Sequence, residues 1–584
     1  MIKTTDYPAW QIGLLVAVLI FLRASYRGRW RRFSNIENVP GPKPASWFGG
    51  NFLQMFNPAA WSYHEFLAKE YGSMVHLHGP FGSQALYTFD ARAMHTIFVK
   101  DQETFDEADH FIKANQLLFG PGLLGTRGND HRRQRKMLNP VFSAAHLRGM
   151  YPLFLEVTHR LEGAIVTKLE SGPEIQEIDV LSWMARTALE LIGQAGLGYS
   201  FDPLVGEESA HPYPRIIKQL IPTLLRLQFW ITTIFPRVAR IGTPKFRRFI
   251  VNLLPWKDLH HMRDMVDYMH EVASEIYEEK KKVFEGGDEA ITQQTGRGKD
   301  LISILMKENM KAVDEDRLAD SEVIGQVFRY PYFDATFLLI VPITLIFAAM
   351  DTTSNAMARI LHLLVNRPDV QGKLRSELTQ AREQNGGQDI SYEDLGNLPY
   401  LDAICRETLR LYSPAPYVSR TASKDGVLPL HKPVLGLDGT QMHEIAVPKG
   451  TSILVSIFNA NRNTDLWGKD ADEWKPERWL SSLPSAVTDA PIPGDDVHWW
   501  WAILHVRVNI LYSEFRSGAK GALLSGFKFS QLEMKTVISI LVEKFEFLPS
   551  VQDAKTFWQM NSVTAPVVGE NEHPQLPIRI RLAK

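Results

Sequence analysis

A single cysteine, Cys405, limits how this chain can be held together. With one thiol among 584 residues, no disulfide can form within the chain, and the cysteine-rich zinc spacings are impossible. Stability must therefore come from a packed core, for which the 45% of hydrophobic residues are ample. The absence of disulfides fits a reducing, cytosol-facing location.

The charged residues are almost evenly divided between the two signs. The chain has 64 Lys and Arg residues against 66 Asp and Glu residues, so its formal net charge is −2. Proteins that bind nucleic acid need a basic surface that displaces counterions from the phosphates. We therefore expect no nucleic-acid partner.

An apolar run near the amino terminus, residues 8–22, is followed directly by a cluster of arginines. These are Arg23, Arg27, Arg29, Arg31 and Arg32. A membrane core needs about 20 apolar residues, so the run is short, but Trp10 and the arginines can extend it at the interface. Residues 1–33 are therefore expected to form a signal anchor with its basic flank.

Positive residues after a membrane segment keep that side in the cytosol, which leaves residues 34–584 on the cytosolic face. We expect a single-pass protein of the endoplasmic reticulum membrane. A cleaved secretory signal is an alternative, because Ala24 and Ser25 are small residues near the end of the run. A buried first helix is a second alternative, although the arginine cluster would end it abruptly.

The body of the chain has mainly helical patterning. From Glu65 onward apolar residues recur at helical spacing, and only short pieces such as 74–78 and 84–88 have the character of strands. The pattern predicts a mainly α fold with small β-sheets. The stretch 221–235 is strongly apolar, and either burial in a core or contact with a membrane would explain it.

Glu407 and Arg410 lie three residues apart on a predicted helix, so both side chains occupy one face and can join a common ion-pair network. Arg420 follows beyond a proline-rich turn, and the sequence Pro-Glu-Arg-Trp comes later, at 476–479. Together these residues resemble the paired signature of the cytochrome P450 superfamily of haem-thiolate monooxygenases. The similarity is to the membrane-anchored, eukaryotic microsomal type, and we expect a fungal member.

This resemblance implies a structural network around a cofactor. In that family the glutamate and arginine of the first motif bind the arginine of the second, which implies core rather than catalytic roles for Glu407, Arg410 and Arg478. Removing one member would leave a buried charge uncompensated, at a cost of about 3 to 5 kcal/mol. Three unrelated surface ion pairs are the alternative interpretation.

Two further regions are similar to family segments that hold the haem propionates. His131 and Arg135 have the spacing i, i+4, so both can reach one anion from a helix. Arg420 matches the arginine downstream of the Glu-x-x-Arg motif, and a guanidinium suits a carboxylate well. The resemblance thus implies cofactor-binding roles for these three residues, with a solvated basic face as the alternative for the helical pair.

Asp351 and Thr352 follow the sequence Ile-Phe-Ala-Ala-Met at 346–350, which resembles the long central helix of the family. In that helix the threonine hydroxyl organises water and protons, and the neighbouring acid assists. The resemblance therefore implies that Asp351 and Thr352 are catalytic. An ordinary Asp-Thr pair in a helix turn is the alternative.

The family pattern breaks where the axial cysteine belongs. Alignment on the sequence after the ligand loop places Leu524 there, whereas alignment on the sequence before it places Ala522 there. Neither residue can bind iron, and thiolate donation is what favours O–O cleavage. Cys405 is a poor substitute, because its helix already carries the Glu-x-x-Arg pair. His498 and His505 precede the expected loop and lack a thiolate's electron donation, so no metal ligand is expected.

Two segments, 327–342 and 497–525, depart from the family sequence. Pro331 and Pro342 fall in the first segment, and a proline inside a helix should kink or end it at a cost of about 3 kcal/mol. We interpret both segments as products of a misassembled reading frame, with intron-like sequence in the first and altered exon edges in the second.

The resemblance spans nearly the whole chain and implies a single large P450 domain, 34–584, after the anchor. It implies haem b as cofactor, electrons from NADPH through a membrane-bound flavoprotein reductase, and insertion of one oxygen atom from O2 into an apolar small organic substrate. The chain as written lacks the thiolate ligand and is expected to be inactive. A non-catalytic membrane-anchored relative or a misassembled gene product is the alternative function.

Overall fold

The computed structural model describes most of the body of the chain. The described residues are 35–120, 122–138, 143–206, 208–238, 241–285, 300, 302–304, 337–490, 525–571 and 573–583. The expected anchor, 1–33, lies outside them, as do most of 327–342 and almost all of 497–525. Within the described ranges, no helix combines the length and the apolar character needed to cross a membrane.

The chain divides into two compact units, each built from stretches that are separated in the sequence. The first comprises residues 1–53, 63–107 and 419–455, and the second comprises 54–62, 108–418 and 456–584. Most of the strands of the first unit belong to one sheet, whereas the second unit is mainly helical.

A five-stranded sheet dominates the first unit, with the strand order β1-β2-β8-β5-β3. Its strands are β1 (Met74–His78), β2 (Gln84–Thr88), β3 (Phe105–Glu107), β5 (Tyr417–Ala422) and β8 (Ser452–Ser456). The strands expected at 74–78 and 84–88 are thus confirmed, and they pair antiparallel. Because β3 pairs antiparallel with β5, Glu107 lies opposite Arg420 in the register.

Smaller elements complete the first unit. They are η1 (Ile36–Asn38), α3 (Trp61–Tyr71), η2 (Pro80–Gly82), α4 (Ala91–His95), η3 (Thr96–Lys100) and the antiparallel pair β6 (Gly426–Leu435) and β7 (Gln441–Val447), while α2 (Phe52–Met55) straddles the boundary. Asp90 caps α4, because its Oδ1 accepts from the backbone N–H groups of Arg92 and Ala93 at 3.0 Å each. The same oxygen accepts from the backbone N–H of His431 at 2.9 Å, which ties α4 to β6.

The second unit contains the long helices. From residue 109 to 285 they are α5 (Asp109–Phe119), α6 (Gly128–Leu138), α7 (Ala144–Glu170), α8 (Val180–Ile192), η5 (Gly193–Leu197), α9 (Tyr213–Phe229), η6 (Trp230–Ile234), α10 (Phe235–Val238), α11 (Pro244–Leu253) and α12 (Lys257–Glu285). The later ones are α16 (Phe337–Val365), α17 (Pro368–Gln384), α18 (Tyr392–Asn397), α19 (Pro399–Leu411), α20 (Ile457–Ala460), α21 (Thr464–Trp467), η7 (Pro476–Leu480), α22 (Ser485–Thr488), α24 (Ser525–Lys544) and η9 (Asp553–Lys555).

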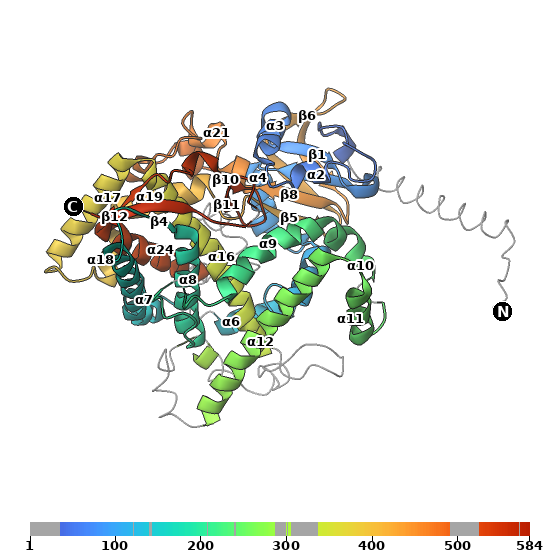
Figure 1. Cartoon of the computed structure of the whole chain (residues 1–584). Helices are drawn as coiled ribbons and strands as arrows, with labels where there is room; N and C mark the ends of the chain where they lie inside the picture. Colours follow the sequence, from blue (N-terminus) through green and yellow to red (C-terminus); the bar gives the residue numbers. More distant parts are fainter. Residues whose placement is uncertain are drawn as a thin grey trace, which may run out of the picture. The chain divides into compact units, whose positions relative to one another are not determined.

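α16 is the central helix of this unit, and α8, α12 and α24 pack against it (Figure 1). Its apolar side chains Met350, Met357, Ile360 and Leu361 have no exposed surface. A helix with fully buried apolar residues at these positions needs partners on several sides, and the three neighbouring helices supply them. The core of the unit therefore runs along α16.

Pro342 does not end the central helix. Prolines in 327–342 were expected to kink or end a helix; α16 begins at Phe337 and continues through Pro342 to Val365, so the expected end is wrong and a kink stays a prediction. Pro342 is the sixth helical residue, so its missing N–H removes a single hydrogen bond, to the carbonyl of Leu338, close to the helix start. Pro331 lies outside the described residues.

Two small sheets border the helices of the second unit. Their orders are β4-β12-β9 and β10-β11, with β4 (Gln176–Asp179), β9 (Phe545–Leu548), β10 (Thr556–Gln559), β11 (Ala565–Val568) and β12 (Pro577–Leu582). The expected fold class, mainly α with small β-sheets, is confirmed.

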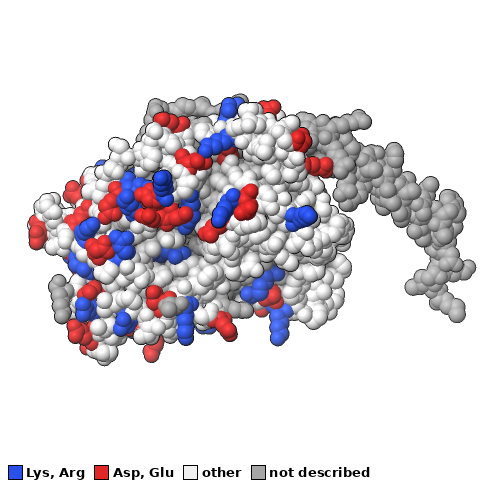
Figure 2. All heavy atoms as spheres, turned by 90° about the horizontal axis from the view of Figure 1, so that it is seen from above, with Lys and Arg blue, Asp and Glu red and all other residues white. Residues whose placement is uncertain are grey.

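The charged side chains on the molecular face in Figure 2 are mixed in sign. Lysine and arginine lie beside aspartate and glutamate, most densely at one side of the view. Fields from neighbouring opposite charges cancel over short distances. This face therefore presents no extended surface of one sign.

Candidate functional site

α19 brings Glu407 and Arg410 together in the core of the second unit. Pro399 opens this helix, where its missing N–H costs nothing, and the spacing of three residues puts both side chains on one face. Arg410 Nε lies 2.8 Å from Glu407 Oε2, and Arg410 Nη2 lies 2.8 Å from Glu407 Oε1. The side chains are 1% and 0% exposed, so this is a buried bidentate ion pair.

Arg478, on η7, completes the network at the same carboxylate. Its Nε lies 3.3 Å from Glu407 Oε1, and the indole Nε1 of Trp479 donates to Glu407 Oε2 at 3.0 Å. The backbone N–H of Lys475 also donates to Glu407 Oε1, at 3.1 Å. The structure therefore brings all three residues of the predicted network together around one buried carboxylate.

A second carboxylate compensates the extra cation. Arg478 Nη1 donates to Asp470 Oδ1 at 2.9 Å, and the hydrogen bond from Arg478 lowers the pKa of Asp470 to about 2. Arg478 thus binds a second carboxylate at the edge of the network, since Asp470 is 32% exposed and also lies 3.1 Å from Lys475 Nζ. Asp470 was not singled out from the sequence, because an acidic residue eight positions before Arg478 has no local pattern that points to it.

Arg410 also binds main-chain carbonyl groups of the segment 461–473, which precedes the second motif. Its Nη1 donates to the carbonyl oxygens of Asn461 at 2.6 Å and Ala471 at 2.7 Å, and its Nη2 donates to that of Glu473 at 3.2 Å. The guanidinium also lies 4.9 Å from the ring centroid of Trp467. Every side of the guanidinium is therefore occupied by protein, which fits a structural role.

The predicted acid and alcohol, Asp351 and Thr352, are buried on α16. Thr352 Oγ1 donates to the carbonyl oxygen of Ala348 at 2.7 Å, the ordinary back-bond of a threonine in a helix. The hydroxyl oxygen keeps its lone pairs and can still accept a hydrogen bond from water. The chemistry open to Thr352 in this arrangement is therefore to receive and orient a proton donor.

Asp351 is held by a lysine that the sequence interpretation missed. Lys218 Nζ, on α9, lies 2.8 Å from Asp351 Oδ1 and also donates to Ser354 Oγ at 2.8 Å and Asn355 Oδ1 at 2.9 Å. Burial lowers the pKa of Lys218, while Asp351 opposes that shift. Three acceptors on one helix face thus satisfy the three N–H bonds of the ammonium.

The predicted propionate ligands belong to separate elements. His131 lies on α6 and is 4% exposed, and Arg135 lies on the same helix. Arg420, on β5, lies 2.8 Å from Glu107 Oε1 of β3 and donates to the carbonyl oxygen of Ser419 at 2.9 Å. The sheet register explains the pair with Glu107, and a propionate contact by any of the three residues stays a prediction.

Cys405 decides whether this chain fits a haem-thiolate group, because that group needs an ionised thiol as its axial ligand. The residue lies inside α19 and is 1% exposed, and burial raises its pKa to about 12. Cys405 is therefore a protonated core thiol, and no other residue of the chain is a cysteine. The residues present do not fit a thiolate-ligated haem.

The other positions considered for the iron lie outside the described residues. These are Ala522, Leu524, His498 and His505. Within the described ranges, no group of three His, Cys, Asp or Glu side chains is placed to hold a metal ion.

α24 follows the expected ligand loop and carries an unusual carboxyl group. Glu533 is 0% exposed, and among the described residues neither of its side-chain oxygens has a hydrogen-bond partner. Burial raises its pKa well above the ordinary glutamate value. Burial therefore favours the protonated form of Glu533 in the folded protein.

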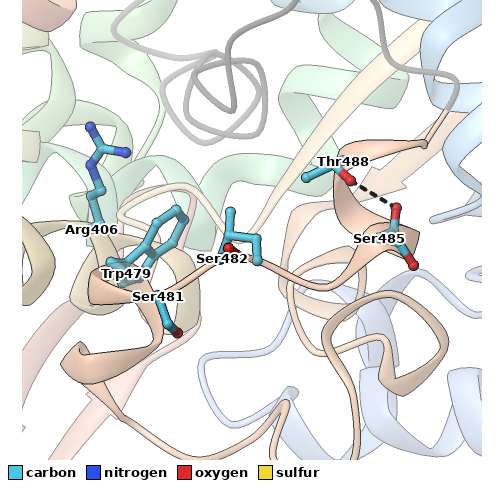
Figure 3. Close-up of a pocket in the computed structure, with 7 residues that line it drawn as sticks. Arg406, Trp479, Ser481, Ser482, Ser485 and Thr488 are labelled. Carbon is cyan, nitrogen blue, oxygen red and sulfur yellow. Dashed lines mark hydrogen bonds between the residues drawn. The ribbon is translucent and has the colours of Figure 1, made fainter.

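A hollow of about 500 Å³ opens beside the Glu407 network (Figure 3). Trp479, whose indole donates to Glu407, lines it together with Arg406, Leu483 and four residues that carry a hydroxyl group, Ser481, Ser482, Ser485 and Thr488. Its lining is therefore mixed, with the apolar surfaces of Trp479 and Leu483 beside the polar side chains.

Comparison with known proteins agrees with the two motifs. The family model described as Cytochrome P450 matches residues 39–488, which takes in parts of both compact units and both motifs. The match ends before the atypical segment 497–525.

Curated relatives cover almost the whole chain. Cytochrome P450 monooxygenase 91 of Postia placenta is 43% identical over 551 residues, 94% of this chain and 95% of the relative. Cytochrome P450 monooxygenase 81 of the same fungus is 42% identical over 584 residues, 100% of this chain and 99% of the relative. Ganoderic acid synthetase of Ganoderma lucidum is 40% identical over 553 residues, 94% of both chains.

The family model matches parts of both units, and the fungal relatives match over almost their full length. Both comparisons assign the fold and its buried network to the same family. The enzymes of that family are oxidoreductases that carry haem b. This chain is a fungal member of the cytochrome P450 monooxygenase family.

Proposed function

We propose that this fold is the shell of a monooxygenase that takes NADPH electrons from a flavoprotein reductase and oxidises an apolar small molecule, and that this chain lacks the ligand for the reaction. The name of one relative, ganoderic acid synthetase, supports a small organic product for the family branch. Family membership supports the oxygen chemistry. The burial and raised pKa of Cys405 support the loss of this oxygen chemistry in this chain.

The single observation that carries the proposal is the burial of the only thiol. A thiolate donates electron density that favours O–O cleavage, and a thiol with a pKa of about 12 is protonated at neutral pH. Moving Cys405 out of α19 would also disturb Glu407 and Arg410, two and five residues further along the same helix. Asp351 and Thr352 lie on α16 as expected. Without the thiolate ligand, however, there is no activated oxygen to which they could deliver protons.

The test is the spectrum of the reduced protein with carbon monoxide. We expect the full-length chain to give no thiolate-type Soret band, whether or not it takes up haem. Two restored variants, Leu524→Cys and Ala522→Cys, examine the two candidate positions, and Cys405→Ala is the matched control. A thiolate-type band from the unaltered chain, or NADPH-dependent hydroxylation by it, would overturn the proposal.

We also propose that residues 1–33 anchor the protein in the endoplasmic reticulum membrane with its body in the cytosol. The support is the apolar run 8–22 and the five arginines that follow it. Removing residues 1–33 should release the protein from the microsomal pellet. In intact microsomes, added protease should digest the body, and a body protected until detergent is added contradicts the cytosolic orientation.

A misassembled gene product is the second candidate. It is favoured by the end of the family match at residue 488, just before the atypical segment 497–525. Sequencing the mature transcript distinguishes the two readings. An isoform with a cysteine in the expected ligand loop would identify the active enzyme. A message that encodes 497–525 unchanged would identify a non-catalytic relative.

A further inference from the structure

Arg359 is a cation that lies against two aromatic rings and has no carboxylate partner. It is on α16, and its Cζ lies 3.5 Å from the ring centroid of Trp558 on β10 and 4.4 Å from that of Tyr412, which directly follows α19. Within the described ranges, its guanidinium makes no hydrogen bond or ion pair with the protein. Charged groups taken out of water are normally paired with an opposite charge. Arg359 is therefore a position where an anion from solution would supply the missing partner.

The indole of Trp558 is fixed by neighbouring side chains. Its Nε1 donates to His362 Nδ1 at 3.1 Å, and His362 Nε2 lies 2.9 Å from Asp553 Oδ1. The carbonyl oxygen of Trp558 accepts from the indole Nε1 of Trp61 at 2.7 Å. Asp553, the carboxylate of this chain of hydrogen bonds, thus binds His362 rather than Arg359. Because the ring has one orientation, the guanidinium that lies over it is held in place as well.

A second arginine shares the ring of Tyr412. Arg462 Cζ lies 5.6 Å from the ring centroid of Tyr412 and 4.1 Å from that of Phe458. Its Nε lies 3.4 Å from Asp472 Oδ1, but that carboxylate is 73% exposed, and such pairs contribute little. Burial lowers the pKa of Arg359 to about 9, Tyr412 opposes this shift, and Arg462 adds to it. The two cations thus act on each other, and an anion close to both would relieve their repulsion.

The donors of this cluster suit an oxyanion. A guanidinium has five N–H donors in one plane, and contact with the faces of rings leaves the edge of that plane open. The hydroxyl of Tyr412 has no hydrogen-bond partner in the part of the chain that the structure describes, and it is a further donor. Arg359 and Tyr412 are both partly exposed, so a small anion can reach them from solvent.

We infer that Arg359, Tyr412 and Arg462 form a binding site for a phosphate group, which we call the Arg359 site. The planar fork of Arg359 matches two phosphate oxygens. A phosphate monoester carries a charge of about −1.5 to −2 at neutral pH, which two arginines balance better than one. All three residues belong to the second compact unit. The inference depends on neither haem nor its axial ligand, so its test is separate from that of the proposed function.

Thermal unfolding of the full-length chain in nonionic detergent tests the site. Inorganic phosphate is the probe, and sodium chloride keeps the ionic strength constant. A ligand that binds only the folded state raises the unfolding temperature in a way that depends on its affinity. We expect Arg359→Gln to weaken phosphate binding about a hundredfold, since two charge-assisted hydrogen bonds are lost. Arg367→Gln is the matched control and should leave the affinity unchanged, because Arg367 is 45% exposed and already paired with Asp369.

Tyr412→Phe is the second variant, because it keeps the ring and removes only the hydroxyl. It should weaken phosphate binding about tenfold, the effect of losing one hydrogen bond to a charged group. If Arg359→Gln does not fold, Tyr412→Phe decides the question, and an unchanged phosphate affinity would then overturn the inference.

Phosphate also stabilises folded proteins in general, because it is excluded from their surfaces. That effect is common to all variants, so an equal rise in unfolding temperature for the unaltered chain, Arg359→Gln and Arg367→Gln would overturn the inference. Acetate distinguishes a phosphate site from a carboxylate site. With a single charge it should bind about tenfold more weakly than phosphate, and equal affinities would contradict a site for phosphate.

Discussion

Lys218 Nζ lies 2.8 Å from Asp351 Oδ1, which joins α9 to the central helix α16 through a buried ion pair. The two residues are 133 positions apart in the sequence. Both side chains are less than 10% exposed, so each charge depends on the other for its stability.

Replacing Lys218 by methionine should destabilise the protein by about 3 to 5 kcal/mol, because the buried Asp351 would lose the cation that compensates it. The free energy of unfolding from urea titration measures the effect. Lys373→Met is the control, since Lys373 and Glu477 form an exposed pair whose loss should cost less than about 1 kcal/mol. Equal effects of the two substitutions would contradict the buried pair.

Glu407→Gln should also cost about 3 to 5 kcal/mol, because Arg410 and Arg478 would lose the carboxylate they share. The matched control is Glu546→Gln, which removes a pair with Arg581 whose side chains are 27% and 30% exposed, and this should cost less than about 1 kcal/mol. Chemical denaturation compares the two. A small effect at Glu407 would mean that the network contributes little to folding.

His159 should make stability depend on pH. Its ring nitrogens lie 2.8 Å from Glu162 Oε2 and 3.0 Å from Asp389 Oδ2, and although burial acts in the opposite direction, these carboxylates raise its pKa. A raised pKa stabilises the fold below the ordinary histidine value of about 6.5, and this contribution disappears as the pH rises through the folded-state pKa. The advantage of the unaltered protein over His159→Gln should therefore shrink with rising pH.

Urea midpoints of both proteins on either side of neutral pH measure this difference. His95→Gln is the control, because burial lowers the pKa of His95 and the opposite dependence is expected. A constant difference between the unaltered protein and His159→Gln would exclude the ion pairs as the cause.

Cys405 should resist alkylation in the native state. Burial raises its pKa from 9.0 to about 12, which alone reduces the thiolate fraction about a thousandfold. Labelling kinetics with iodoacetamide, before and after denaturation, check this. The same reagent should modify the exposed thiol of Leu437→Cys at once, and comparable rates at the two positions would show that Cys405 is accessible.

Glu533→Gln should stabilise the protein at neutral pH. The raised pKa means that the folded state keeps a proton that the unfolded state releases above about pH 4.3, so stability falls as the pH rises. Glutamine has nearly the same size as glutamate but does not titrate, so the substitution removes this dependence of stability on pH. Thermal unfolding at several pH values measures it, and a loss of stability at neutral pH would indicate an ionised Glu533.

The sequence predicted the parts of the site that depend on spacing along one helix or on a recognisable motif. Glu407, Arg410 and Arg478 lie together as expected. Lys218 was not predictable, because its partner lies on another helix and only the packing of α9 on α16 brings the two together. Asp470 escaped notice for a similar reason, since its role depends on how the turn before η7 folds back.

The fold was predictable in class and less so in detail. The strands at 74–78 and 84–88 were found because short alternating pieces stand out in helical surroundings. Pro342 does not end its helix as one part of the expectation had it, because a proline near the helix start removes only one hydrogen bond. The apolar residues Phe246, Phe249, Ile250 and Leu253 of α11 have the spacing of a buried helix face, yet they are 38% to 61% exposed. Spacing alone does not distinguish an exposed apolar face from a buried one, so this exposure was visible only in the structure.

The bonds from Arg410 to three carbonyl oxygens have a consequence for sequence variation. Every amino acid supplies the same carbonyl, so the exposed residue Glu473 can be replaced while the bond from Arg410 survives. Asn461 and Ala471 are 1% and 0% exposed, so their replacements must also fit the core. Libraries at position 473 should therefore retain folding far more often than libraries at Glu407.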